Sequence, residues 1–480
     1  MGANFSDFPY DDPGPAVTKD RVLRIAKKIE DPDAVIIESI KDQDGQELGE
    51  GLASNMEAIE VQALVGPYED PKTYNWVLKS TPRDVSRFHR SRHVFSYNER
   101  EVRFFHDLLP RLKEFANSKK DGGFSMPSFT ETPFVSWTAE DKILVMENLK
   151  LKGYKDGINL LVDGIDEDHT EMGVKWLAKF HALGYAYFQN TFCECRNWRC
   201  QSRGTCDCGI KNLEKSDLNI FLMNFSDIPN FDGIQNSYST ISEDIFLRTL
   251  DEIEKDGEKK YVEKFQDFLD KHGHFFRQCE QFREFDHTAF KVNTFTHGDA
   301  HVGNIMYQYG EENNGTNVRD VTFIDFQFVL YKPAILDLHK FIWTSTTPDT
   351  RKHLTKILKT YYTTFMKSIK QLKSPLKYTF DEFLNDFRRS FVDGLYWATH
   401  IFLSQVCTPK EDRVSMDELS RLCSDMVSNY NNPEFQEEYN KVIAKLDESS
   451  RKNDKYQTRM KGFMDDVMDL DLIYSGNIWL

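Results

Sequence analysis

The sequence lacks the long apolar runs of a membrane protein and the positive charge of a nucleic-acid-binding protein. No stretch of about 18 apolar residues occurs, so no membrane span is predicted. Lys and Arg number 61 against 77 Asp and Glu, which gives a formal net charge of −16. This balance argues against nucleic acid as a main partner, because phosphate backbones require a basic surface. A small anionic ligand needs only a local positive site and stays compatible.

The first residues also lack the basic start and apolar core of a secretory signal peptide, so we expect a cytoplasmic protein. They do match the pattern for N-myristoylation at Gly2, with Ser6 at the required spacing. Acidic residues follow, and no basic patch supplies a second membrane signal, so we do not favour acylation. The sequence leaves the oligomeric state open.

Composition and length predict a globular chain of two or three units. Hydrophobic residues make up 40% and charged residues 29% of the chain, and domains average about 150 residues. We expect a flexible tail over residues 1–16, an N-terminal lobe over 17–147 and a C-terminal lobe over 148–480, with a cysteine-rich insert at 193–208.

Hydrophobic periodicity predicts an α+β fold, with a small β-sheet lobe followed by a larger, mainly helical lobe. In the first lobe it predicts helices over 17–30 and 99–115 and two strands over 58–65 and 74–80, and a short apolar run over 143–146 leads to the end of this lobe. In the second lobe it predicts a β-rich stretch over 292–328 and helices over 167–188, 240–282, 350–373, 380–406 and 433–447.

The segment with the clearest chemistry begins at His297-Gly298-Asp299 and reaches Asn304, and Asp325 follows in an apolar stretch. Phosphoryl transfer from ATP needs one carboxylate beside the acceptor hydroxyl, and a second carboxylate with an amide oxygen to hold Mg²⁺. We therefore predict Asp299 as the catalytic residue and Asn304 and Asp325 as the metal ligands. Each residue alone is common in turns or caps, but their order and spacing favour the catalytic interpretation.

Cysteines cluster in one short segment, at Cys193, Cys195, Cys200, Cys206 and Cys208. Zinc requires four thiolate or imidazole ligands, so five thiols are one too many for a closed site, and the Cys-x-Cys pairs are tighter than the usual spacing. A reduced loop is the interpretation we favour for a cytoplasmic protein. Zinc and disulfides are the alternatives.

Several segments together resemble a known family. The loop from His297 to Asn304 is similar to the His-Gly-Asp-x-His-x-Gly-Asn loop of kinase-like phosphotransferases. Residues 144–154, 177–183 and 323–347 resemble the ecdysteroid kinase-like family, also called CHK kinase-like, and the likeness extends over roughly residues 45–410. The resemblance implies a bilobal protein-kinase-like fold with ATP between the lobes. It also implies ATP- and Mg²⁺-dependent phosphorylation of a small-molecule hydroxyl group, on an ecdysteroid or another secondary alcohol.

The resemblance further implies the residues of a nucleotide site. Lys79 matches the strand lysine that meets the α- and β-phosphates, and Glu101 is its expected helix partner, with Glu99 as the rival. His297 matches a loop histidine that is more structural than chemical. Asp337 matches a carboxylate that braces the catalytic loop, although helix capping explains it equally well. A phosphate-covering loop is expected at Gly49, Gly51, Ala53, Ser54 and Asn55, and adenine contacts at Met146, Glu147, Asn148 and Leu149.

The sequence departs from the family at His301, where many members carry an aromatic residue. A histidine there is similar to choline and aminoglycoside phosphotransferases, so a choline- or aminoglycoside-like kinase is the alternative function. A catalytically silent nucleotide-binding protein is the alternative from another class, but the presence of Asp299, Asn304 and Asp325 argues against it. Protein kinase activity is not expected, because the sequence lacks Asp-Phe-Gly and Ala-Pro-Glu motifs.

Other polar and aromatic residues have two interpretations. His181 lies on an apolar helical face, which favours a hydrogen-bonded core histidine over a ligand. Trp343, Tyr396 and Trp397 either line an acceptor pocket or pack in the core, because aromatic faces suit steroid-like and cationic ligands as well as neighbouring side chains.

Overall fold

The computed structural model describes thirteen ranges of the chain: residues 18–30, 35–42, 55–66, 68–80, 94–137, 142–193, 207–222, 231–255, 259–272, 290–310, 317–409, 412–429 and 431–469. These form two units. One unit comprises the described residues up to Pro110 together with Phe129–Lys155, and the other comprises Arg111–Ser128 and the described residues from Asp156 onward. In these ranges no helix is both long and apolar enough to cross a membrane.

The first unit contains a five-stranded sheet in the order β1-β2-β3-β5-β4, in which every neighbouring pair is antiparallel. The two predicted strands are confirmed as β2 and β3, and the apolar run at 143–146 lies within β5, whereas β1 and β4 were not predicted. Their bounds are β1 (Val35–Asp42), β2 (Asn55–Val65), β3 (Asp70–Ser80), β4 (Phe134–Trp137) and β5 (Lys142–Glu147). β2 and β3 form a hairpin that turns at Gly66, whose φ of 82° suits glycine.

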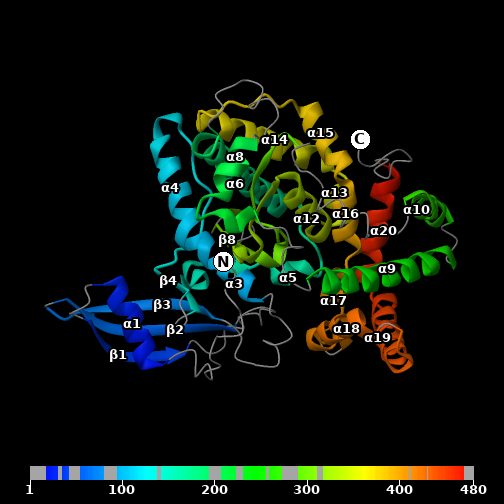
Figure 1. Ribbon diagram of the computed structural model, residues 1–480, viewed down its shortest axis with the longest axis horizontal. Coiled ribbons are helices and arrows are strands. Elements are labelled where there is room, and N and C mark those ends of the chain that lie inside the picture. Colours follow the sequence, from blue (N-terminus) through cyan, green and yellow to red (C-terminus); the bar gives the residue numbers. More distant parts are fainter. Residues whose placement is uncertain are drawn as a thin grey trace. The chain divides into compact units, whose positions relative to one another are not determined.

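Helix α1 (Lys19–Ile29) covers one face of this sheet (Figure 1). Thr18 caps its first turn by accepting a hydrogen bond from the Arg21 N–H at 3.2 Å. Val22, Ile25 and Ala26 are fully buried and pack with the inward-facing side chains of the strands. The amphipathic pattern predicted for residues 17–30 therefore forms part of a real core.

The helix that contains Glu101 is interrupted by a π-helical turn. It runs as α3 (Val94–Arg103), the π-turn η1 (Phe104–Leu108) and α4 (Leu109–Ser118). Phe104, Phe105 and Leu108 of the turn are buried. The sequence predicts a helix over 99–115, which is confirmed, but not the widened turn.

In the second unit, the long helix α6 (Glu167–Thr191) packs against α14 (Leu354–Gln371) and strand β7 (Asn293–Thr296). Asp166 caps α6 by accepting from the His169 N–H at 3.0 Å. The predicted β-rich stretch contains β7, which pairs with β10 (Leu330–Pro333), and a hairpin of β8 (Ile305–Tyr309) and β9 (Val318–Phe323). Helix α12 (Ile335–Ser345) follows β10.

Residues 380–406 are helical, as predicted, but they do not form one continuous helix. The structure has three helices there: α15 (Phe380–Arg389), α16 (Phe391–Thr399) and α17 (Ile401–Cys407). The chain turns at Ser390, whose hydroxyl donates to the Asp386 carbonyl, and again at His400, whose ring accepts from the Phe402 N–H. Ser and His side chains that bond nearby backbone groups compete with the helical ladder. Helix α16 packs against α12, so this break positions aromatic residues next to the candidate site.

The remaining described segments of the second unit are also mainly helical, as predicted (Figure 1). The fold class is therefore α+β, with a sheet-rich first unit and a mainly helical second unit. The other α-helices of the described residues are α5 (Ile158–Leu161), α8 (Asp207–Glu214), α9 (Phe231–Lys255), α10 (Lys259–His272), α13 (Pro348–Arg351), α18 (Met416–Asn429), α19 (Pro433–Arg451) and α20 (Asp454–Asp469).

Candidate active site

The loop that carries Asp299 connects β7 to β8 and depends on one glycine. Gly298 has a φ of 78°, and a Cβ atom there would lie 2.1 Å from the Phe328 carbonyl oxygen. Only glycine fits this conformation at this close approach. A short 3₁₀ turn, Val302–Asn304, then leads into β8, and the His301 ring caps that turn by accepting from the Gly303 N–H at 3.1 Å.

Asp337 braces this loop from the first turn of α12. Its carboxylate accepts hydrogen bonds from the N–H groups of His297, at 2.6 Å, and Gly298, at 2.8 Å. It is 2% exposed and lies 2.9 Å from His181 Nε2. The predicted bracing role is confirmed; the N-cap position of α12 belongs to Ala334 instead. Burial favours a raised pKa for Asp337, but the hydrogen bond and charge of His181 outweigh it and lower the pKa.

His181 is a core histidine, as the sequence predicts. It is fully buried, and its Nδ1 atom lies 2.7 Å from the Tyr361 hydroxyl, while Nε2 faces Asp337. His181 of α6 thus holds the Asp337 carboxylate of α12 in place, and that carboxylate in turn holds the backbone of the catalytic loop.

His297 uses both ring nitrogens within the protein. Nδ1 accepts from the Asp299 N–H at 3.2 Å, and Nε2 lies 2.9 Å from the Ile324 carbonyl oxygen. This pattern requires the neutral tautomer with the proton on Nε2, and burial lowers the His297 pKa in agreement with it. A further bond joins the Ile324 N–H to the Asn304 carbonyl at 2.9 Å. The loop is therefore tied to the end of β9, directly before Asp325.

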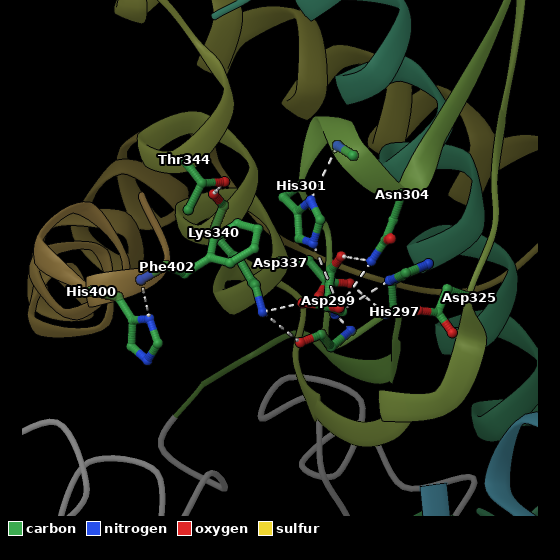
Figure 2. Close-up of polar contacts among 12 residues, drawn as sticks. His297, Asp299, His301, Asn304, Asp325, Asp337, Lys340, Thr344, His400 and Phe402 are labelled. Carbon is green, nitrogen blue, oxygen red and sulfur yellow. Dashed lines mark hydrogen bonds and ion pairs between the residues drawn. The ribbon is translucent and has the colours of Figure 1, made fainter. Parts of the chain in front are cut away.

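The Asp299 carboxylate lies at the centre of this arrangement and is 16% exposed. Asn304 Nδ2 donates to Asp299 Oδ2 at 2.9 Å and to its carbonyl at 3.0 Å. Lys340 forms an ion pair with Oδ1, and His301 Nε2 lies 3.6 Å from Oδ2. Figure 2 shows Lys340 and Asn304 on opposite sides of Asp299. Burial favours a raised pKa, but the charges of Lys340 and His301 outweigh it and hold the Asp299 pKa well below its ordinary value.

Asp325 follows β9 in a backbone conformation that is rare outside glycine, with a φ of 66°. Aspartate tolerates this region better than most residues, and such strain clusters at functional sites. Gln327 Nε2 donates to Asp325 Oδ2 at 3.1 Å. The structure thus brings the predicted Asp299, Asn304 and Asp325 into one segment held together by backbone hydrogen bonds (Figure 2).

In the first unit, Lys79 of β3 is paired with Glu101 of α3. Lys79 Nζ lies 2.6 Å from Glu101 Oε2, and the two side chains are 8% and 3% exposed. The rival Glu99 is 39% exposed and lies 4.0 Å from Arg103. The geometry selects Glu101, because residues two apart on a helix point about 200° from one another.

The structure gives less information on the predicted phosphate-covering loop and on the predicted adenine contacts. Gly49, Gly51, Ala53 and Ser54 lie outside the described residues, and Asn55 opens β2. In the segment from Met146 to Leu149, the N–H groups of Glu147 and Asn148 donate to the carbonyls of Glu131 and Asn75. These two N–H groups are therefore already used within the protein. Contacts between adenine and other backbone groups of the segment stay a prediction.

The cysteine segment, for which we favour a reduced loop over a zinc site or disulfides, also lies largely outside the described part of the chain, which omits residues 194–206. Cys193 and Cys208, which border that gap, have partly buried side chains. Within the described ranges, no group of three or more His, Cys, Asp or Glu residues could hold a metal ion.

Lys340 is the residue of this site that the sequence analysis missed. Its side chain is 8% exposed, and it comes from α12, three positions after Asp337. The available signal was a lysine that follows His339 and precedes the apolar residues Phe341, Ile342 and Trp343. A charge buried in such a run requires a partner, but periodicity does not indicate that the partner is Asp299.

The fold and the family comparison define a small-molecule phosphotransferase of the kinase-like type. The model of the ecdysteroid kinase-like family matches residues 48–207 and 210–374, well over half of the chain. The chain belongs to this family, which confirms the resemblance.

Two solved structures are similar over most of the chain. One is the GDP and kanamycin complex of APH(2")-IIia, with 12% identity, a TM-score of 0.36 and coverage of 91% of this chain and 100% of that one. The other is an ethanolamine kinase of Plasmodium vivax, with 11% identity, a TM-score of 0.29 and coverage of 87% and 88%. Both scores are too low to support a statement on this chain. No curated protein sequence matches it.

Proposed function

We propose that this protein transfers a phosphoryl group from ATP, with Mg²⁺, to a hydroxyl group of an ecdysteroid or another secondary alcohol. The observation that carries the proposal is the position of the Asp299 carboxylate. It projects from a loop whose backbone is fixed by Asp337 and His297, and its own oxygens are oriented by Asn304 and Lys340. A carboxylate oriented from both sides is suited to position an acceptor hydroxyl.

In this proposal Asp299 binds the acceptor hydroxyl and accepts its proton. The lowered pKa keeps the carboxylate ionised at neutral pH, as a hydrogen-bond acceptor must be. The same lowered pKa makes Asp299 a weak base. Orientation of the hydroxyl is therefore its main contribution, in line with the small demand for base catalysis in a loose phosphoryl-transfer step.

Asn304 and Asp325 are the proposed Mg²⁺ ligands, and their donor set fits a hard cation. Asn304 uses its amide nitrogen for both hydrogen bonds to Asp299, so the amide oxygen is directed away from that carboxylate. Asp325 supplies a carboxylate from the neighbouring strand end, tied to Asn304 through Ile324. When bound, Mg²⁺ supplies positive charge that offsets the charge of the nucleotide phosphates.

Lys79 and Glu101 are proposed to serve the nucleotide from the first unit. The buried pair holds the ammonium in one position, and a fixed cation is what binding of the α- and β-phosphates requires. His297 contributes by holding the loop, since neither ring nitrogen is left for the reaction. A cytoplasmic location stays part of this proposal.

The test is an ATP-consumption screen over alcohols, with the phosphorylated product identified by mass spectrometry. The panel should contain ecdysteroids, other secondary alcohols, choline and an aminoglycoside. Wild type should phosphorylate at least one alcohol, and Asp299→Asn should abolish that product while nucleotide binding persists. A wild-type protein that binds Mg-ATP but phosphorylates no alcohol in the panel would favour the silent nucleotide-binding alternative.

A further inference from the structure

The ion pair at Asp299 places a positive charge of the protein between a carboxylate and an aromatic face. Lys340 Nζ pairs with Asp299 Oδ1 and lies 3.4 Å from the centroid of the Trp397 ring. It is also 3.5 Å from the Gly298 carbonyl oxygen. Lys340 therefore contacts three groups that attract a cation: an ionised carboxylate, an indole face and a backbone carbonyl.

The position of this ammonium is fixed by the fold. Lys340 lies on α12 one turn after Asp337, which is bonded to the loop backbone. Trp397 lies on α16, which packs against α12, and its ring contacts Tyr396 and His400 at centroid distances of 4.9 and 5.6 Å. Lys340 and its aromatic partner thus come from two helices that pack together, and its carboxylate partner comes from the loop that Asp337 braces. Lys340 is 8% exposed, so this ion pair is largely shielded from solvent.

A carboxylate next to an aromatic face is the arrangement that recognises ammonium ligands such as choline. Here the chain's own lysine takes that position. An acceptor with an ammonium group near its hydroxyl would have to bring a second positive charge to the same place, and two like charges at close range repel strongly in a partly buried site. An uncharged acceptor meets no such repulsion.

A second pair of rings lies near Asp299. The His301 ring lies 5.1 Å from the Phe402 ring, and His301 Nε2 is 3.6 Å from Asp299. Phe402 belongs to α17, just past the turn at His400 that separates it from Trp397. The two side chains that face the Asp299 carboxylate, Lys340 and His301, are thus each in contact with an aromatic ring. Such rings favour contact with the apolar body of an alcohol.

We propose that Lys340 is a specificity-determining residue: it occupies the cation position beside Asp299, so the site takes uncharged alcohols and rejects acceptors with an ammonium group near the hydroxyl. This inference rests on the proposed function in so far as Asp299 faces the acceptor. It separates an ecdysteroid-like acceptor from the choline- and aminoglycoside-like alternative by a single side chain.

The experiment compares binding of choline with that of its uncharged isostere, in which carbon replaces the quaternary nitrogen, by titration calorimetry. The variants are Lys340→Met, which removes the charge and keeps an unbranched apolar stem, and Lys340→Arg, which keeps the charge. Lys340→Met should bind choline on the order of tenfold more tightly than wild type, the effect of one desolvated cation–aromatic contact. Lys340→Arg should show no gain, and affinity for the isostere should stay within about twofold in both variants.

A second variant tests whether the gain uses the proposed position. Adding Trp397→Leu to Lys340→Met removes the aromatic face and should return choline affinity to the wild-type value. The inference is overturned if wild type binds choline as tightly as the isostere, or if folded Lys340→Met gains no choline affinity. If Lys340→Met does not fold, the affinities of the wild-type protein for choline and for the isostere still test the inference.

These outcomes are distinct from failure of the proposed function, because binding is measured without turnover. A protein that gains choline affinity in Lys340→Met yet phosphorylates no alcohol would retain the binding inference and lose the kinase assignment. A protein that phosphorylates an uncharged alcohol but binds choline equally well in wild type and Lys340→Met would retain the kinase assignment alone.

Discussion

The carboxylate of Asp337 and the N–H of His297 are 40 residues apart in the chain and 2.6 Å apart in the structure. The same carboxylate accepts the Gly298 N–H and faces His181. The conformation of the loop that carries Asp299 is therefore specified by a buried charge on α12 and a histidine on α6. Substitutions of Asp337 or His181 should therefore alter the position of Asp299, although neither residue is proposed to contact a ligand.

We expect Asp337→Asn to reduce both stability and activity. The amide replaces one acceptor oxygen with a donor that faces other donors, and an unsatisfied buried group costs about 1–3 kcal/mol. Turnover should also fall by about tenfold or more, because loosening of the loop misplaces Asp299, while the KM for ATP changes little. Asp386→Asn is the matched control: this buried carboxylate bonds Tyr378 and Arg389 away from the loop. Equal activity losses in the two variants would contradict the bracing role.

Asp299→Ala should abolish most of the turnover and leave nucleotide binding nearly intact. The loss should be about 10²-fold or more, because the acceptor hydroxyl loses the carboxylate that orients it and accepts its proton. Steady-state kinetics with the acceptor found in the screen, together with fluorescence titration of a nucleotide analogue, would separate the two effects. Near-normal turnover would remove Asp299 from its assigned role.

Asp325→Asn should weaken Mg²⁺-dependent nucleotide binding, because a charged hard ligand becomes neutral. Affinity for the nucleotide without metal should hardly change, so calorimetry with and without Mg²⁺ isolates the effect. Asp320→Asn serves as the control, since Asp320 lies on β9, the strand that precedes Asp325, and accepts a hydrogen bond from the Ser128 hydroxyl. Unchanged Mg-ATP affinity in Asp325→Asn would argue that the metal is held elsewhere.

The parts of this site that could be predicted are those encoded locally. The His-Gly-Asp loop, the strand that contains Lys79 and the helix that carries Glu101 each have a short pattern. The 3.6-residue period shows that Glu99 and Glu101 cannot both face Lys79, and the family resemblance favoured Glu101. The Asp337 brace followed from the family resemblance. Strands β1 and β4 at the two sheet edges were missed: β4 is only four residues long, too short for a clear alternation.

Lys340 and the breaks at Ser390 and His400 could not be predicted for a different reason. The partners of Lys340 lie on the catalytic loop and on α16, far along the chain, and only the packing of α12 brings them together. Similarly, a helical pattern persists through residues 380–406, while the side-chain hydrogen bonds that interrupt it depend on tertiary surroundings.

Acid should destabilise the second unit through His339. Burial lowers its pKa from 6.5 to about 3, and the ring bonds Trp343 and the Phe387 carbonyl as a neutral group. The unfolded chain therefore binds a proton that the folded chain excludes, so stability is lost as the pH falls below the ordinary value. Between pH 6 and pH 5 the loss should be about 1 kcal/mol. Urea unfolding of wild type and His339→Gln at both pH values should show the steeper loss in wild type; equal slopes would contradict this prediction.

The last prediction compares the two candidate glutamates on α3. Glu101 Oε2 lies 2.6 Å from Lys79 Nζ in a buried pair, whereas Glu99 is partly exposed beside Arg103. Glu101→Gln should impair activity about as strongly as Lys79→Met, because the lysine loses the charge that holds it, while Glu99→Gln should change little. The double variant of Glu101→Gln and Lys79→Met should be hardly worse than Lys79→Met alone, since the pair acts as one unit. The measurement is steady-state kinetics at varied ATP concentration. Additive losses of activity in the double variant would mean that Glu101 and Lys79 act separately. Impaired activity of Glu99→Gln with normal activity of Glu101→Gln would exclude the pair from nucleotide binding.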